Sequence, residues 1–114
     1  MMALLGRQFV ILLEQCADEF INNPDRVIDS VSSVATDCGL HIVNTCEHRF
    51  VPQGLTVILL LSQSHLAVHT WPEHRLMTVD LFVCQDCFDV QAFLDRLVSV
   101  SGAVHIEQSC VFEK

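Results

Sequence analysis

Hydrophobic residues recur along this chain with two different periods, which predict six strands and two helices. Unbroken apolar runs, or a two-residue alternation of apolar and polar positions, indicate the strands. A recurrence every three to four residues indicates the helices, each with an apolar stripe that can cover a sheet. Strands are predicted over residues 8–14, 40–46, 56–61, 66–70, 76–84 and 103–109, and helices over 24–38 and 86–101.

Both predicted helices have recognisable ends. Asn23 and Pro24 supply an asparagine cap and an early proline for the first helix. Gly39 and Gly102 follow the two apolar stripes, at positions where a positive φ is often required. We therefore expect amphipathic helices that pack on the sheet.

The order β-α-β-β-β-β-α-β implies an α+β fold, a two-layer sandwich of a mainly antiparallel sheet with both helices on one face. A chain of 114 residues forms one domain, residues 1–114. Helices on one face leave the other face of the sheet to be covered. Because 51% of the residues are hydrophobic, we expect a homodimer in which two sheets pair.

Composition excludes several classes of protein. The net charge is −8 with only six Lys and Arg, which argues against nucleic acid but would tolerate a cationic ligand. The longest apolar runs, 9–13 and 57–61, are too short to cross a bilayer, so we expect no membrane partner. Arg7 interrupts the apolar start of the chain and no cleavage site for a signal peptide follows, so we expect a cytoplasmic protein.

The six cysteines are expected to be reduced in that compartment. Packing as small hydrophobic groups is the expectation for Cys16, Cys38, Cys46 and Cys110. Cys84 and Cys87 have CxxC spacing, but a single pair is weak evidence for zinc or a redox site, and we predict no metal.

Groups that can hold or move protons are densest in residues 62–73. Ser62, Ser64, His65 and His69 fall within eight residues, directly after the apolar run 57–61. Alternation places His65, His69 and Trp71 on one face of the strand. Composition alone leaves open whether this is a site or the polar end of a strand. For Phe50, in the loop before this region, composition favours a core position.

Residues 62–73, Ser-Gln-Ser-His-Leu-Ala-Val-His-Thr-Trp-Pro-Glu, closely resemble the processing segment of bacterial and archaeal S-adenosylmethionine decarboxylases. The pattern of that family is Ser-Glu-Ser-His-Leu-(Thr/Ser)-(Ile/Val)-His-Thr-Trp-Pro-Glu. Three more segments match in order, Leu-Gly-Arg at 5–7, His-Arg-Phe at 48–50 and Val-Asp-Leu-Phe-Val-Cys at 79–84. The resemblance is collinear over nearly the whole chain.

The resemblance implies a proenzyme that cuts itself between Gln63 and Ser64 into a β chain of 1–63 and an α chain of 64–114. The Ser64 hydroxyl attacks the Gln63 carbonyl in an N-to-O acyl shift, and β-elimination and hydrolysis leave a pyruvoyl group derived from Ser64. His69 matches the histidine that assists processing. Thr56 stands near a serine that commonly helps it, and His65 and Trp71 are supporting members of the motif.

The same resemblance implies decarboxylation of S-adenosylmethionine for polyamine (spermidine) biosynthesis. The pyruvoyl cofactor forms a Schiff base with the substrate amine and acts as an electron sink. Cys84 matches the cysteine that returns a proton to the substrate. Phe50 matches an aromatic residue near the adenine, and Glu73 a carboxylate at the ribose hydroxyls. In the family the sites lie at the interface of a dimer.

The sequence departs from the family pattern in ways that leave other functions open. Gln63 replaces the usual glutamate before the cleavage serine, and His-Arg-Leu at 74–76 replaces a common Tyr-Gly-Tyr/Leu. The first strand also lacks an acidic residue that is often present. Relatives of the family have shifted to L-ornithine or L-arginine as the substrate, and such a change is expected to lie in an altered pocket around Arg75. Loss of the carboxylate charge at position 63 permits an unprocessed, inactive paralogue that binds an active partner.

Overall fold

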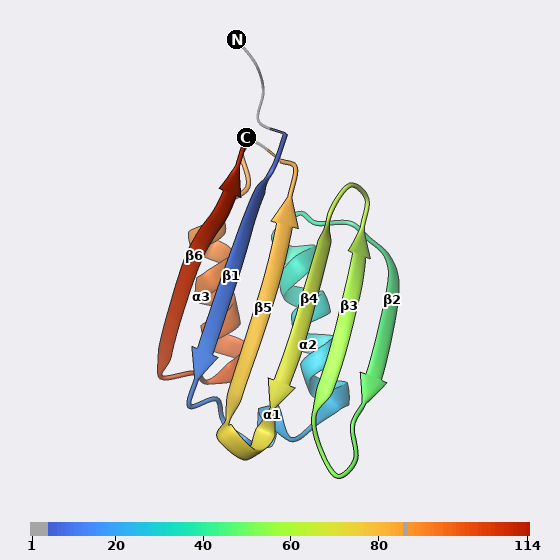
Figure 1. The fold of residues 1–114 in the computed structure, drawn as a ribbon, viewed down its shortest axis with the longest axis vertical. Helices are drawn as coiled ribbons and strands as arrows, with labels where there is room; N and C mark the ends of the chain where they lie inside the picture. Colours follow the sequence, from blue (N-terminus) through green and yellow to red (C-terminus); the bar gives the residue numbers. More distant parts are fainter. Residues whose placement is uncertain (1–4, 86) are drawn as a thin grey trace.

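A computed structural model describes residues 5–85 and 87–114 of the chain and shows the expected six strands, two long helices and two short additions (Figure 1). The additions are a four-residue helix before the first long helix and a 3-10 turn after the fourth strand. The elements are β1 (Arg7–Glu14), α1 (Asp18–Ile21), α2 (Pro24–Asp37), β2 (Ile42–Arg49), β3 (Leu55–Leu61), β4 (His65–Trp71), η1 (Pro72–His74), β5 (Leu76–Val83), α3 (Val90–Ser101) and β6 (His105–Glu113).

The strands form one antiparallel sheet in the order β2-β3-β4-β5-β1-β6. All three helices lie on the same side of this sheet, which confirms the predicted α+β arrangement in two layers (Figure 1). We call the opposite, helix-free side of the sheet the outer face. The pairing of two outer faces in a dimer stays a prediction.

The core lies between the helices and the inner face of the sheet, because each element turns its apolar stripe there. Val27 and Val31 of α2, and Phe93 and Leu97 of α3, are fully buried. The side chain of Asn23 caps α2 by accepting a hydrogen bond from the Arg26 N–H at 3.1 Å, as expected. Among the described residues, no helix is long and apolar enough to span a membrane.

Gly39 and Gly102 end the two long helices with φ values of +87° and +70°, as the sequence predicts. The start of α3 differs from the prediction. The helix begins at Val90, and the Asp89 side chain caps it by accepting a hydrogen bond from the Ala92 N–H at 3.0 Å. The predicted start at Asp86 lies outside the described residues. The predicted end of α2 at Cys38 is its C-cap.

Two strands extend three or more residues beyond their predicted ends, because ladder pairing continues past the apolar segment. β2 includes Glu47, His48 and Arg49, which the sequence placed in a loop, since these residues pair with the start of β3. β6 begins at His105 and continues to Glu113, since it pairs along the whole of β1.

An unbroken apolar run such as 57–61 predicts a strand that is buried on both faces, and this expectation is wrong for β3. Val57, Leu59 and Leu61 are buried against the helices, but Ile58 and Leu60 are 44% and 50% exposed on the outer face. The reason is that helices cover only one side of the sheet. Exposed apolar side chains therefore gather on the outer face, and they include Val10, Ile58, Leu60, Trp71 and Phe112.

All six cysteines are free thiols, but only part of the packing prediction holds. Cys16 is buried and Cys38 is half-buried, whereas Cys46 and Cys110 are exposed. The last two lie on β2 and β6, the edge strands of the sheet, and Cys46 pairs with Ile58 of the outer face. Burial raises the pKa of the Cys16 and Cys38 thiols above the ordinary value.

Candidate active site at the two ends of the sheet

The β3–β4 hairpin holds the Gln63–Ser64 peptide at one end of the sheet (Figure 1). The turn is closed by a hydrogen bond from the Leu61 N–H to the Ser64 carbonyl at 3.0 Å, and the Ser62 N–H donates to the His41 carbonyl at 3.2 Å. A cavity of about 150 Å³ opens beside it. Its lining residues are Leu40, His41, Leu61, Ser62, Gln63, Ser64, Cys84 and Gln85.

Cys84 reaches this hairpin because it follows β5, the strand that pairs with β4. Its thiol donates a hydrogen bond to the carbonyl oxygen of Gln63 at 2.9 Å. That carbonyl belongs to the peptide bond between Gln63 and Ser64. A donor on the oxygen draws electron density from the carbonyl carbon and stabilises negative charge if a nucleophile adds there. The structure thus brings Ser64, Gln63 and Cys84 together.

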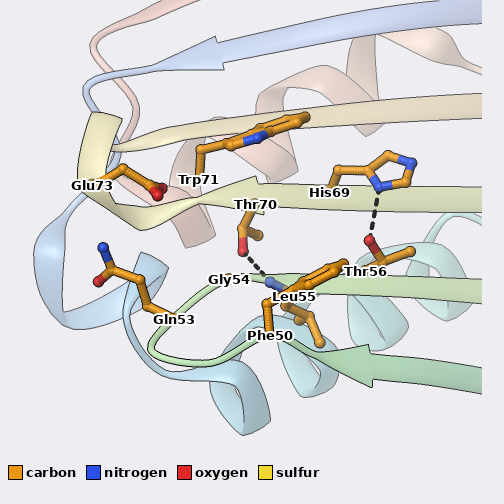
Figure 2. A pocket seen from close by; sticks show the side chains of 9 residues that line it. All are labelled: Phe50, Gln53, Gly54, Leu55, Thr56, His69, Thr70, Trp71 and Glu73. Carbon is orange, nitrogen blue, oxygen red and sulfur yellow. Dashed lines mark hydrogen bonds between the residues drawn. The ribbon is translucent and has the colours of Figure 1, made fainter.

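The second group of predicted residues surrounds a cavity of about 230 Å³ at the other end of the sheet. Figure 2 shows Phe50 and Trp71 on two sides of this space, the Thr56–His69 pair at one end, and Glu73 with Gln53 at the other. The complete lining is Phe50, Gln53, Gly54, Leu55, Thr56, His69, Thr70, Trp71 and Glu73.

Strand register orients the histidine in this second cavity. Thr56 of β3 pairs with His69 of β4, which places the Thr56 Oγ1 2.9 Å from the His69 Nδ1. One strand position further on, the Leu55 N–H donates to the Thr70 Oγ1 at 3.0 Å. The hydroxyl of Thr56 therefore fixes the imidazole ring and leaves its Nε2 directed away from the bond.

The core position expected for Phe50 from composition is wrong. Phe50 directly follows β2, is 50% exposed, and its ring lies 4.6 Å from the ring of His48. The loop back to β3 turns it toward the cavity, and a Cβ added to Gly54, which has φ +109°, would stand 3.6 Å from the Phe50 Cβ. An exposed aromatic ring across the cavity from Trp71 can stack on a flat ligand.

The two groups of residues do not meet within one chain. Ser64 immediately precedes β4, whereas His69 lies five residues further along the same strand. At about 3.3 Å per residue, roughly 17 Å separates them. One protomer therefore holds two partial sites, one with the scissile peptide and the thiol, and one with the histidine, the aromatic rings and Glu73.

Some predicted residues lie outside both cavities. His65 stacks on Phe82, with ring centroids 6.0 Å apart. Arg75 has φ +52°, and its Nε donates to the Cys16 carbonyl at 2.7 Å, so it does not line the cavity in which a change of substrate was expected. Cys87 is exposed. Within residues 5–85 and 87–114, no group of three or more His, Cys, Asp or Glu side chains could hold a metal ion.

The sequence did not identify His41, Gln53 or Gln85 as candidates, although all three line a cavity. His41 precedes an edge strand and the other two lie in loops, so no periodicity marks them. Only the fold shows that they stand beside motif residues far away in the sequence.

Comparisons with known proteins match this chain to one family. The family model described as S-adenosylmethionine decarboxylase matches residues 7–111. A protein of Thermosipho africanus (strain TCF52B) named "S-adenosylmethionine decarboxylase proenzyme" is 38% identical over 107 residues, which cover 92% of this chain and 82% of that protein. One of the same name from Pseudomonas aeruginosa (strain LESB58) is 34% identical over 100 residues, 84% of this chain and 62% of that one.

A crystal structure gives the same result for the fold. The adenosylmethionine decarboxylase from Aquifex aeolicus VF5 superimposes with a TM-score of 0.85 over 96% of this chain and 90% of that chain, at 24% sequence identity. With the family match over most of its length, the chain belongs to the S-adenosylmethionine decarboxylase family.

Proposed function

We propose that this protein is a pyruvoyl-dependent S-adenosylmethionine decarboxylase of polyamine (spermidine) biosynthesis that acts in the cytoplasm. It is made as a single-domain proenzyme that cuts itself between Gln63 and Ser64, which leaves chains of 1–63 and 64–114. The proposal rests on the hydrogen bond from the Cys84 thiol to the carbonyl oxygen of Gln63, at the peptide bond that would be cut. The names of the relatives support both the activity and the proenzyme.

In the first step the Ser64 Oγ adds to the Gln63 carbonyl carbon. The hydroxyl proton passes to the Ser64 nitrogen, the C–N bond breaks, and an ester replaces the peptide bond. During this addition negative charge develops on the Gln63 oxygen, where the Cys84 S–H donates. Gln63 keeps the shape of a glutamate but not its charge, so its side chain cannot serve as a base in this step.

In the second step a base removes the Cα proton of Ser64. The ester C–O bond breaks, chain 1–63 leaves with a carboxylate, and the remaining dehydroalanine takes up water and releases ammonia to become the pyruvoyl group. His69 suits the role of base. If its Nδ1–H donates to the Thr56 Oγ1, which is 2.9 Å away, its Nε2 keeps a free lone pair for the proton.

We propose that a second copy of the chain supplies this histidine, because His69 lies about 17 Å along β4 from Ser64 of its own chain. Two outer faces related by a two-fold axis that runs across the strands would place the Ser64 end of one sheet over the His69 end of the other. The exposed apolar residues of the outer face, such as Ile58 and Leu60, would be buried by this contact.

The size of the second cavity supports a site that two subunits complete. Its volume of about 230 Å³ is below the roughly 300–1,000 Å³ typical of ligand sites. Phe50 and Trp71 would hold the adenine between aromatic rings, and the Glu73 carboxylate would accept hydrogen bonds from the ribose hydroxyls. The net charge of −8 favours a substrate that carries a sulfonium cation.

Ser64, as the precursor at the tip of the hairpin, and Cys84 beside it fit a pyruvoyl cofactor at this position. The group, once formed, supplies an electron sink for the decarboxylation. The Cys84 thiol, which stands next to residue 64, returns a proton to the substrate carbon.

Release of CO2 from carboxyl-labelled substrates tests the proposal. The purified protein is expected to release CO2 from S-adenosylmethionine and not from L-ornithine or L-arginine. Release from one of those amino acids instead would keep the self-processing chemistry and change the substrate. Inactivity on all three, with an uncut chain, would overturn the proposal in favour of an inactive paralogue.

A further inference from the structure

Arg7 makes long-range contacts that the proposed mechanism does not yet use. It opens β1 and pairs with Val83, the last residue of β5. Its Nη2 donates to the Phe88 carbonyl at 2.9 Å and to the Gln85 carbonyl at 3.4 Å. Its Nε is buried and has no hydrogen-bond acceptor among the described residues. Arg7 therefore gives up hydration in order to hold two backbone carbonyls.

The two carbonyls belong to residues that follow Cys84 closely in the sequence. Gln85 is the next residue, and its Nε2 donates to the Gly39 carbonyl at 3.3 Å. Phe88 is anchored in the core, with its ring 5.8 Å from that of Phe93. Arg7 thus links the Gln85 backbone, directly after Cys84, to the buried residue Phe88 and to the end of the sheet.

Gly6 allows Arg7 to reach these two carbonyls. A Cβ at this position would stand 2.6 Å from the Phe82 Cζ and 3.0 Å from the Val83 carbonyl oxygen. The absence of a side chain lets the start of β1 lie close against the end of β5. Arg7 is then within reach of the Gln85 and Phe88 carbonyls. Within residues 5–7, which match the family pattern but line neither cavity, Gly6 and Arg7 thus hold the backbone that follows Cys84.

We propose that Arg7 is a positioning residue for self-cleavage. Its hydrogen bonds to the Gln85 and Phe88 carbonyls orient the Cys84 thiol toward the Gln63 carbonyl oxygen. A thiol has one proton and is a weak donor, so its effect depends on the direction in which it points. A small displacement of the backbone at Cys84 removes the contact that stabilises the developing oxyanion. The inference rests on the proposed self-cleavage.

A double-mutant cycle tests this inference, with the rate of self-cleavage as the readout. Pulse-labelled proenzymes are made by cell-free synthesis, and the uncut chain is followed on denaturing gels. Arg7→Met keeps the length of the side chain but removes its donors, and Cys84→Ala removes the thiol. Arg26→Met, at an exposed position on α2, is the matched control and is expected to cleave at the wild-type rate.

We expect Arg7→Met to slow cleavage about tenfold when Cys84 is present and less than about twofold in the Cys84→Ala background. Arg7→Lys, which can reach one carbonyl at a time, is expected to give an intermediate rate. It also serves as the test if Arg7→Met does not fold. A general loss of structure would slow cleavage equally in both backgrounds.

Equal slowing in both backgrounds, or wild-type cleavage in Arg7→Met, would overturn the role of Arg7 and leave the proposed function intact. A wild-type chain that does not cut itself at all would instead overturn the proposed function, and the inference with it. The two failures are therefore distinguishable in one set of reactions.

Discussion

Two inactive variants should restore each other if His69 acts on Ser64 of the partner subunit. Ser64→Ala removes the nucleophile and His69→Ala removes the base. Within one chain these residues lie about 17 Å apart along β4, too far for proton transfer. A mixed dimer, however, contains one site in which the wild-type Ser64 of one chain faces the wild-type His69 of the other.

The expected yield follows from the two-fold symmetry of the dimer. Equal co-expression of the two variants gives about half mixed dimers, and each of these has one complete site and one that lacks both residues. Only the His69→Ala chain retains Ser64, so about half of the His69→Ala chains should be cut. None of the Ser64→Ala chains should be cut.

Different affinity tags on the two variants allow the cut fraction of each to be measured by mass spectrometry. Each variant expressed alone is the control and should yield no pyruvoyl-blocked α chain. If the His69→Ala chain stays uncut in the mixture although mixed dimers are recovered, His69 acts within its own chain and the composite site is wrong.

Three further predictions concern the orientation of His69, the outer face and the buried core. Thr56→Val removes the hydroxyl that orients His69 and should slow formation of the pyruvoyl group about tenfold at unchanged thermal stability; an unchanged rate would show that the 2.9 Å contact has no role. Leu60→Asp places a charge on the outer face and should give monomers by light scattering that no longer cleave, whereas dimers that still cleave would place the interface elsewhere. Cys16 should be alkylated far more slowly than the exposed Cys46, because burial both shields its thiol and raises its pKa; its thiolate, and so its modification, should appear only at a pH above that at which an ordinary thiol ionises.

Local pattern was sufficient to predict most of the fold. The alternation in β4 and β5 correctly separated buried residues such as Val68 and Leu81 from those on the outer face. α1 was missed because four residues are too few to show a helical period. The exposure of Ile58 and Leu60 could not be read from an apolar run, since it depends on which face of the sheet the helices cover.

The residues of the candidate site were predicted from the motif, but their separation into two cavities was not. Sequence order places Ser64 and His69 five positions apart, and only the direction of β4 shows that they belong to opposite ends of the sheet. Composition placed Phe50 in the core because aromatic residues are usually buried, yet the loop between β2 and β3 holds it at a cavity. The contacts of Arg7 with Gln85 and Phe88 join residues that are too distant in sequence for any local pattern.

The mass of the intact protein under denaturing conditions shows whether the chain cuts itself. We expect two chains that divide between Gln63 and Ser64, with a pyruvoyl group in place of the amino terminus of the α chain. A single uncut chain with an ordinary Ser64, unchanged after long incubation, would contradict this expectation.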